Sequence, residues 1–459
     1  MNDNDILASV KNIHFVGIGG SGMSPLAEIL HARGYHVTGS DVNESDNVAR
    51  LRKLGISIYM EHVPENIGDA ELVIYTSAVN RQNPELLAAE KKGIPLLERA
   101  KLLGMITRRY PNTVAVSGTH GKTTTTSMLS QILLSAGQDP TLFIGGRLPL
   151  INANGRAGSG DTMVCEACEF QDHYLEMSPA ISIILNIDAD HLDYFGTLDN
   201  VIRSFRRFAS RTSRAVIVNA EDPHAPRAVE GLENVEIITF GTHESCDWYA
   251  KNATLLQGSF GTYQLYHRKQ YVADIRLGVP GEHNIANSVA AAAAADLCGV
   301  CAEQIAQGLK AFHGAGRRFE FLGTVNEITV ADDYAHHPTE ISATLSAAKG
   351  MGYQQVWAIF QPFTYTRTAQ HLDGFVDSLS AADRVIVSDI MGSREVNTCH
   401  VSSRQITDRI PGSLYLPTFP EITDYVAANA EQGSLILTMG GGDIYKCARM
   451  ILEKLRQKS

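Results

Sequence analysis

A Gly-Lys-Thr sequence directly after an apolar run is the feature of this chain that most plainly predicts chemistry. The run ends at Val116 and predicts a buried strand, residues 118–121 predict a turn, and residues 124–137 predict a helix. In such a unit the backbone N–H groups at the helix start bind phosphate, Lys122 adds a positive charge, and the Thr123 hydroxyl binds Mg²⁺. We therefore expect ATP or GTP here, although Val116 stands where the strict P-loop pattern has its first glycine.

A second glycine-rich segment lies near the N-terminus. Residues 17–22 match G-x-G-x-x-G between a predicted strand at 13–17 and a predicted helix at 24–34, and Asp41 closes the next strand. The glycines allow close approach to a pyrophosphate, and the carboxylate holds a ribose hydroxyl. These features specify a nucleoside diphosphate, which a nicotinamide coenzyme and a UDP-sugar both contain.

Carboxylates and an imidazole follow two predicted strands of the middle segment. Glu166 ends the apolar strand 162–166, and His191 comes shortly after the strand 181–186. Because the carboxyl ends of parallel strands share one edge of a sheet, both side chains are expected beside the phosphate loop. We choose Glu166 and His191 as ligands for Mg²⁺.

Acids and histidines also gather in the C-terminal third. Asp333, His336 and His337 follow the apolar strand 328–331, and such groups do acid–base chemistry or bind metal. Adjacent histidines in a strand would point to opposite faces, which makes them poor joint ligands. Arg367 follows the next strand, and its guanidinium suits a carboxylate or a phosphate.

Strands alternate with helices along most of the chain, which predicts an α/β protein built on mostly parallel sheets. The 459 residues suggest three domains. We expect a Rossmann-like domain at 1–107, a P-loop-type ATP-binding domain at 108–318 with a β-rich insert, and a Rossmann-like domain at 319–459. In the last of these, helices are predicted at 338–349, 368–380 and 444–454.

Composition and charge indicate which partners and which cellular compartment are expected. The net charge of −11 argues against a nucleic-acid-binding protein, and no apolar run reaches the length of a membrane span. The acidic, polar start of the chain does not match a secretory signal. These properties favour a cytoplasmic protein with small-molecule substrates.

Two Cys-x-x-Cys pairs raise the alternative of a zinc site. Cys165/Cys168 and Cys298/Cys301 lie far outside zinc-ribbon spacing, and the first pair falls in an apolar run. Buried thiols in a core are the favoured interpretation.

Taken together, these motifs resemble the Mur ligase family, and within it the branch that adds L-alanine. The resemblance spans nearly the whole chain and rests on 17–23, 118–125, 190–193, 281–287, 316–319 and 332–340. The phosphate loop is shared by Mur and folylpolyglutamate ligases, whereas 17–23 and 332–340 are more specific to the alanine-adding branch.

The resemblance implies ATP-dependent ligation of L-alanine to the lactyl carboxylate of UDP-N-acetylmuramate through an acyl phosphate, in peptidoglycan precursor synthesis. ATP and Mg²⁺ would be the cofactors, and the chain would act as a monomer or a homodimer. The implied catalytic residues are Lys122, Glu166, His191, Arg318 and Asp333, with Thr123, Glu166 and His191 on the metal. The implied nucleotide-binding residues are Gly118, Thr119, His120, Gly121, Lys122, Thr123, Thr124, Asn284 and Asn287. The implied substrate-binding residues are Gly17, Gly19, Gly20, Ser21, Gly22, Met23, Asp41, His337 and Arg367.

This chain departs from the family pattern at three positions. Cys168 stands where many members have Asp, and Phe363 and Thr364 stand where many have His and often Arg. The family's carbamoylated lysine has no counterpart between His191 and Ala250, so none is expected.

Three other functions compete with this interpretation. A ligase that adds an intact tripeptide to the same UDP-sugar would need a larger C-terminal pocket. A nicotinamide-dependent oxidoreductase would explain residues 17–22 but leave the phosphate loop without a role. A binding module that has lost turnover is disfavoured by the presence of Lys122, Glu166 and His191.

Overall fold

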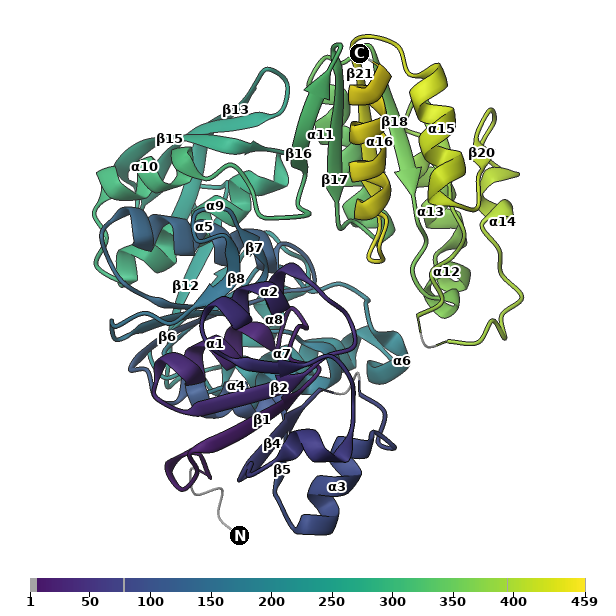
Figure 1. Ribbon diagram of the computed structural model, residues 1–459. Helices are drawn as coiled ribbons and strands as arrows, with labels where there is room; N and C mark the ends of the chain where they lie inside the picture. Colours follow the sequence, from purple (N-terminus) through teal and green to yellow (C-terminus); the bar gives the residue numbers. More distant parts are fainter. Residues whose placement is uncertain (1–5, 77–78, 394, 459) are drawn as a thin grey trace. The chain divides into compact units, whose positions relative to one another are not determined.

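The computed structural model describes residues 6–76, 79–393 and 395–458 and divides into two compact units. Unit one comprises Met1–Lys251, Gln264–Asp274 and Ala286–Ala311, and unit two comprises Asn252–Tyr263, Ile275–Ile285 and Phe312–Ser459. Three sheets of five, ten and six strands carry the fold (Figure 1). Among the described residues, no helix has the length and apolarity that crossing a membrane requires.

The first sheet is parallel and has the strand order β3-β2-β1-β4-β5. Because β1 is flanked by β2 and β4, the chain reverses its direction of winding there, which is where α/β sheets bind ligands. Its strands are β1 (Asn12–Val16), β2 (His36–Ser40), β3 (Ser57–Tyr59), β4 (Leu72–Tyr75) and β5 (Leu96–Glu98). Its helices are η1 (Ile6–Ala8), α1 (Ser24–Ala32), α2 (Asp46–Lys53), η2 (Pro64–Ile67), α3 (Pro84–Lys92) and α4 (Arg99–Thr107).

The second sheet has the order β15-β14-β13-β12-β11-β10-β6-β9-β7-β8 and a parallel centre. The ends of β13, β14 and β15 pass from unit one into unit two. Its strands are β6 (Asn112–Ser117), β7 (Thr141–Leu148), β8 (Ala153–Arg156), β9 (Thr162–Glu166), β10 (Ile181–Ile184), β11 (Ala215–Asn219), β12 (Glu236–Gly241), β13 (Trp248–Leu256), β14 (Phe260–His267) and β15 (Gln270–Pro280). Its helices are α5 (Lys122–Ser135), η3 (Phe170–Glu176), α6 (Leu192–Phe195), α7 (Leu198–Ala209), α8 (Ala225–Val229), α9 (His283–Leu297) and α10 (Ala302–Ala311).

One apolar core joins the first two sheets within unit one. It runs from Phe15 and Leu26 through Met163 to Phe205, and all four side chains are at most 1% exposed. The central strands are buried along nearly their whole length because helices cover both faces of a parallel sheet, and polar residues such as Thr113 and Ser117 of β6 are buried with the apolar ones. Burial of this core therefore fixes the strand ends that carry the two glycine-rich loops.

The third sheet lies in unit two and has the order β16-β17-β21-β18-β19-β20, with only β16 antiparallel to its neighbour. Its strands are β16 (Glu320–Val325), β17 (Ile328–Asp333), β18 (Gln355–Phe360), β19 (Arg384–Val387), β20 (Leu414–Tyr415) and β21 (Ser434–Met439). Its helices are α11 (Pro338–Gly350), α12 (Tyr365–Gln370), α13 (Leu372–Leu379), α14 (Arg404–Thr407), α15 (Phe419–Asn429) and α16 (Tyr445–Lys458).

The predicted α/β class, with three mostly parallel sheets, is confirmed. The division at residues 107 and 318 stays a prediction, because the first two sheets share one compact unit. The predicted helix 368–380 is present but divided: α12 and α13 meet at His371, whose backbone angles (φ −113°, ψ 21°) are not helical.

The adjacent histidines follow the strand, as predicted, so the argument about opposite faces of a strand does not apply to them. β17 ends at Asp333, so His336 and His337 lie in the loop before α11, and His337 is the residue that caps this helix. The thiols vary in burial: Cys165 is buried, Cys168 and Cys298 are half-buried, and Cys301 is exposed, and all four are free.

Candidate active site

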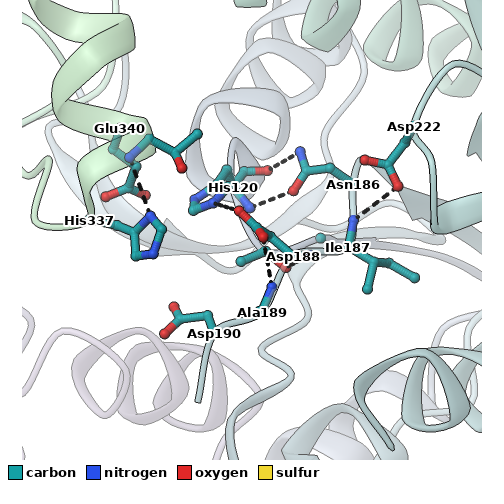
Figure 2. A network of polar contacts seen from close by, with 12 residues as sticks. His120, Asn186, Ile187, Asp188, Ala189, Asp190, Asp222, His337 and Glu340 are labelled. Carbon is teal, nitrogen blue, oxygen red and sulfur yellow. Dashed lines mark hydrogen bonds and ion pairs between the residues drawn. The ribbon is translucent and has the colours of Figure 1, made fainter. Parts of the chain in front are cut away.

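The phosphate loop connects β6 to α5 and is fixed by one asparagine side chain. The Asn186 Oδ1 accepts the His120 backbone N–H at 2.8 Å, and its Nδ2 donates to the His120 carbonyl at 3.1 Å (Figure 2). The Thr119 N–H donates to the Asn186 carbonyl at 3.1 Å. Gly121 has φ +83°, and a Cβ there would lie 2.7 Å from Asn287 Oδ1, so only glycine fits. The structure thus brings Asn287 against the loop, as expected of a nucleotide-site residue.

Lys122 is the first residue of α5, and its ammonium lies within the loop. Its Nζ donates to the carbonyls of Gly118 at 2.6 Å and Thr119 at 3.0 Å, and lies 2.9 Å from a carboxylate oxygen of Glu169. The two side chains are 14% and 3% exposed. Burial alone would lower the pKa of Lys122, but Glu169, Cys168 and Glu166 outweigh it and raise the pKa. The lysine therefore keeps its charge.

Thr123 and Glu166 meet beside the loop. The Thr123 hydroxyl donates to Glu166 Oε2 at 2.9 Å, and the Gly145 N–H of β7 donates to the same oxygen at 2.8 Å. A Cβ at Gly145 would lie 2.4 Å from that oxygen, so the glycine allows the carboxylate to dock on the strand. A hydroxyl and a carboxylate in contact are the hard oxygen donors that Mg²⁺ prefers, so this pair fits the expected metal.

The third predicted metal ligand lies in a different contact set. His191 has φ +54°; its ring centroid lies 4.9 Å from that of Phe170, and its Nε2 lies 3.7 Å from Asp190 Oδ2. These are its described contacts, rather than contacts with Thr123 or Glu166. The metal-binding role of His191 therefore stays a prediction.

The first glycine-rich loop is held from its neighbouring strand. The N–H groups of Gly17 and Ile18 both donate to the Ser40 carbonyl, at 2.8 and 2.9 Å. Gly19 donates its N–H to Asp41 Oδ2 at 2.9 Å, so this carboxylate contacts the loop itself. Met23 is 1% exposed and packs into the core, while the other predicted residues of this loop form the turn before α1.

A cation from a distant segment reaches this loop. A Cβ placed at Gly22 would lie 3.2 Å from Nη1 of Arg99, the first residue of α4. The described residues 17–23 contain no basic side chain. Arg99 is thus the positive charge nearest to the loop in the described contacts, and the sequence offered no signal for it.

A buried carboxylate, Glu85, binds the residue that holds this loop, Ser40. Glu85 is fully buried and accepts hydrogen bonds from Ser40 Oγ and Asn66 Nδ2, both at 2.6 Å. The ring nitrogens of His62 and His14 lie 2.9 and 3.6 Å from its oxygens. Burial opposes ionisation of Glu85, but the nearby His14 ring and the hydrogen bonds from Ser40 and Asn66 outweigh it and lower its pKa. Since Ser40 also binds the loop through its carbonyl, this network fixes the loop's position.

In unit two, Asp333 and Arg318 lie at the end of β17. Asp333 accepts the N–H groups of Phe319 at 2.8 Å and Ala335 at 2.7 Å. Burial raises the pKa of Asp333 to about 6, although Arg318 and these two N–H groups oppose the shift. The Arg318 guanidinium lies over the Tyr334 ring at 5.3 Å.

The other predicted residues of unit two have separate local roles. His337 accepts the Thr339 N–H at 3.4 Å as the N-cap of α11, and Asn284 Nδ2 donates to the Pro280 carbonyl at 2.7 Å. Burial lowers the pKa of His336, and the charges of Arg367 and Arg318 lower it further. The Glu340 carboxylate lies 3.3 Å from Nδ1 of the same ring and opposes this shift of the pKa, so the ring has an acid as well as two arginines around it.

The fold and the two loops together define a nucleotide-binding α/β protein with two separate glycine-rich turns, each between a strand and a helix, in unit one. Three family models match in succession: the Mur ligase family catalytic domain at 12–111, the Mur ligase middle domain at 116–295, and the Mur ligase glutamate ligase domain at 317–442. The chain belongs to the Mur ligase family, and the resemblance inferred from the motifs is confirmed.

Similar proteins span the same length. The UDP-N-acetylmuramate–L-alanine ligase of Caldanaerobacter subterraneus is 44% identical over 454 residues, which cover 98% of either chain. The solved structure of the UDP-N-acetylmuramate–alanine ligase of Thermotoga maritima has a TM-score of 0.83 at 29% identity, covering 98% of this chain and all of that one. A murein peptide ligase from Psychrobacter arcticus has a TM-score of 0.75 at 26% identity, covering 97% and 98%.

Sequence reasoning missed two sets of site residues. Asn186 ends the apolar run 181–186, and a polar side chain at the carboxyl end of a predicted strand was a usable signal. Glu169 lies three residues after Glu166 and offered the same signal. Arg99 and Glu85 lie far along the chain from the loop that they support, and nothing in their local sequence points to it.

Proposed function

We propose that this chain is an ATP-dependent ligase that joins L-alanine to the lactyl carboxylate of UDP-N-acetylmuramate. The observation that carries the proposal is the 44% identity, over 98% of either chain, to a protein named for this reaction. The ligase class itself follows from membership of the family. The product is a precursor of peptidoglycan.

The chemistry explains why such an enzyme needs a phosphate loop. A carboxylate is a poor acylating agent because its leaving group would be oxide. Transfer of the γ-phosphoryl group from ATP to the lactyl carboxylate gives an acyl phosphate and ADP. The alanine amine then attacks the acyl carbon, phosphate leaves, and the amine loses a proton. Phosphoryl transfer depends mostly on positioning and on stabilisation of charge.

The residues of unit one supply that positioning and charge. The N–H groups at the start of α5 and the Lys122 ammonium bind the phosphates, and Asn186 and Asn287 hold the loop in shape. Mg²⁺, held by Thr123 and Glu166 with His191 as a further ligand, would neutralise phosphate charge when bound. Thr124 follows in the first turn of α5 and completes the nucleotide-binding set.

The first glycine-rich loop is our candidate for the UDP group. Its glycines allow close approach of a diphosphate, Arg99 brings positive charge, and Asp41 is positioned to accept from a ribose hydroxyl. In unit two, Arg367 is the candidate clamp for the alanine carboxylate, and Arg318, Asp333 and His337 complete its polar surface. The three predicted domains, 1–107, 108–318 and 319–459, would each carry one substrate.

A tripeptide-adding ligase on the same UDP-sugar is the second candidate. It is favoured by the similarity to the murein peptide ligase from Psychrobacter arcticus. The identity to the alanine ligases is higher, 44% against 26%, and ranks this candidate second.

The deciding experiment measures phosphate release from ATP with UDP-N-acetylmuramate and one amine at a time. L-alanine, glycine, L-serine and the tripeptide are compared, and omission of the sugar nucleotide is the control. Release that requires both the sugar nucleotide and L-alanine is expected. Release that ignores either substrate would overturn the proposal, and preference for the tripeptide would establish the second candidate.

Arg367→Ala tests the alanine pocket. Because a guanidinium contributes about 1.5–3 kcal/mol to a carboxylate contact, we expect the alanine KM to rise at least tenfold with little change in the ATP KM. Arg384→Ala, an exposed site at the start of β19, is the control. Equal rises in both KM values would contradict the assignment.

We place the reaction in the cytoplasm and expect a monomer or a homodimer. All seven cysteines are free, as thiols in a reducing compartment are. ATP and nucleotide sugars are likewise substrates of that compartment.

A further inference from the structure

A pocket of about 430 Å³ lies at the end of the first sheet remote from the glycine-rich loop. Its walls come from η1, the C-terminal end of α1 and the residues after α4. Residues 17–23 precede α1, and the first residue of α1 that lines the pocket is Ile29, six residues after Met23, so about 9 Å of helix separates pocket and loop. None of the roles proposed above uses this pocket.

The lining is positively charged in an acidic protein. Lys11, Arg33 and Arg109 line it, and none of the described lining residues is acidic, whereas the whole chain has a net charge of −11. The nearby acid is Glu71, whose carboxylate accepts the backbone N–H groups of Lys11 and Asn12. Three cations around one concave surface favour an anion.

Two tyrosines orient the guanidinium groups. Arg33 Nη2 donates to Tyr110 Oη at 2.6 Å, and Arg109 Nη1 donates to Tyr35 Oη at 3.0 Å. The hydroxyls are fixed in turn, because Tyr110 donates to Thr141 Oγ1 at 2.8 Å and Tyr35 donates to the Leu7 carbonyl at 2.9 Å. Arg33 Nη2 also donates to the Gly158 carbonyl at 3.4 Å. Because a guanidinium has five N–H donors, these bonds orient it and still leave donors for an anion. Such ordering lowers the entropy cost of binding.

The remaining wall is apolar. The exposed Ala8 and the half-buried Val10 line the pocket beside the buried Leu7, Ile29, Leu30 and Ile106, and the two tyrosine rings add aromatic surface. The volume falls in the range of small-molecule sites, about 300–1,000 Å³. We propose that this pocket binds an organic anion: a small molecule with an apolar or aromatic body and one carboxylate, sulfonate or phosphate head.

The test uses 8-anilinonaphthalene-1-sulfonate and its uncharged relative N-phenyl-1-naphthylamine. Fluorescence titrations are run with saturating ADP and UDP, so that both nucleotide loops are filled. We expect the sulfonate to bind at least tenfold more tightly than the uncharged probe, and sodium octanoate or octyl phosphate, but not octanol, to displace it. Displacement by either anion supports the proposal and identifies the preferred head group.

Variants connect the binding to the pocket. Lys11→Gln, Arg33→Gln and Arg109→Gln should each weaken sulfonate binding several-fold and leave the uncharged probe unchanged. Arg227→Gln, an exposed arginine paired with Asp199, is the matched control. If an arginine variant fails to fold, Lys11→Gln still tests the proposal, because Lys11 is exposed. Its thermal unfolding is compared with that of the wild type. Equal binding of both probes, no displacement by either anion, or identical sulfonate affinity in all three variants would overturn the proposal.

Discussion

The two glycine-rich loops of unit one follow a strand and precede a helix, yet their positive charge comes from different places. The second loop carries its own cation, because Lys122 is the first residue of α5 and is held by Glu169. The first loop has no basic residue, and Arg99 reaches it from α4. The first is also supported by a buried acid–histidine network, and the second by an asparagine. Two loops of the same backbone shape can thus take their positive charge either from a residue within the loop segment or from a distant residue that tertiary packing brings close.

The largest effect is expected for Lys122→Ala. Loss of the cation at the transferring phosphoryl group should lower kcat about 10²–10³-fold, as loss of one transition-state charge contact does. The KM for the UDP-sugar should change little. Steady-state phosphate release measures both values, with the exposed Lys251→Ala as control. A comparable loss of UDP-sugar affinity would contradict the separation of the two loops.

Glu169→Gln tests the ion pair that holds this lysine. Removal of one partner of a buried pair should lower the free energy of unfolding by about 3 kcal/mol, because the ammonium is left uncompensated. Denaturant unfolding gives the value. The matched control is Glu244→Gln, which breaks the solvent-exposed pair with Lys251 and should change the free energy of unfolding far less. Equal costs in the two variants would show that Glu169 does not hold the charge.

Arg99→Gln tests the cation borrowed by the first loop. We expect the KM for the UDP-sugar to rise about tenfold or more, in line with about 1.5–3 kcal/mol for a charged hydrogen bond, while the ATP KM is unchanged. Arg108→Gln, an exposed arginine just after α4, is the control. If Arg99→Gln raised the ATP KM together with the UDP-sugar KM, Arg99 would not act on the first loop alone.

Glu85→Gln tests the buried network that holds the first loop, and its effect on stability should depend on pH. The folded-state pKa of Glu85 is lowered, so its stabilisation is present above the unfolded-state pKa of about 4.3 and is lost as pH falls through the folded-state value. The variant should be less stable by about 1–2 kcal/mol at pH 7, and this difference should shrink as the pH falls below about 4. Thermal unfolding at several pH values measures it. A difference that does not change with pH would mean that Glu85 is not ionised.

The fold class and the second loop were predictable because their signals are local. Apolar runs ending in glycines predicted β6 and its loop, and Lys122 and Thr123 follow directly in the sequence. The capping role of His337 was not predicted: the bond from the Thr339 N–H is local, but histidine is not among the usual N-cap residues. The split at His371 was not predicted either. Local periodicity does not report a break that tertiary contacts impose.

The sequence by itself determined the alternation of strands and helices, the positions of the two glycine-rich turns, and the lysine and threonine of one of them. Each of these features is encoded by residues that lie close together in the sequence. Only the tertiary structure places Arg99 next to Gly22, bonds Glu85 to the Ser40 hydroxyl, and bonds Glu166 to the Gly145 N–H. Such pairs are joined by burial of a common core, and no local pattern encodes which distant side chain a packed core will bring near.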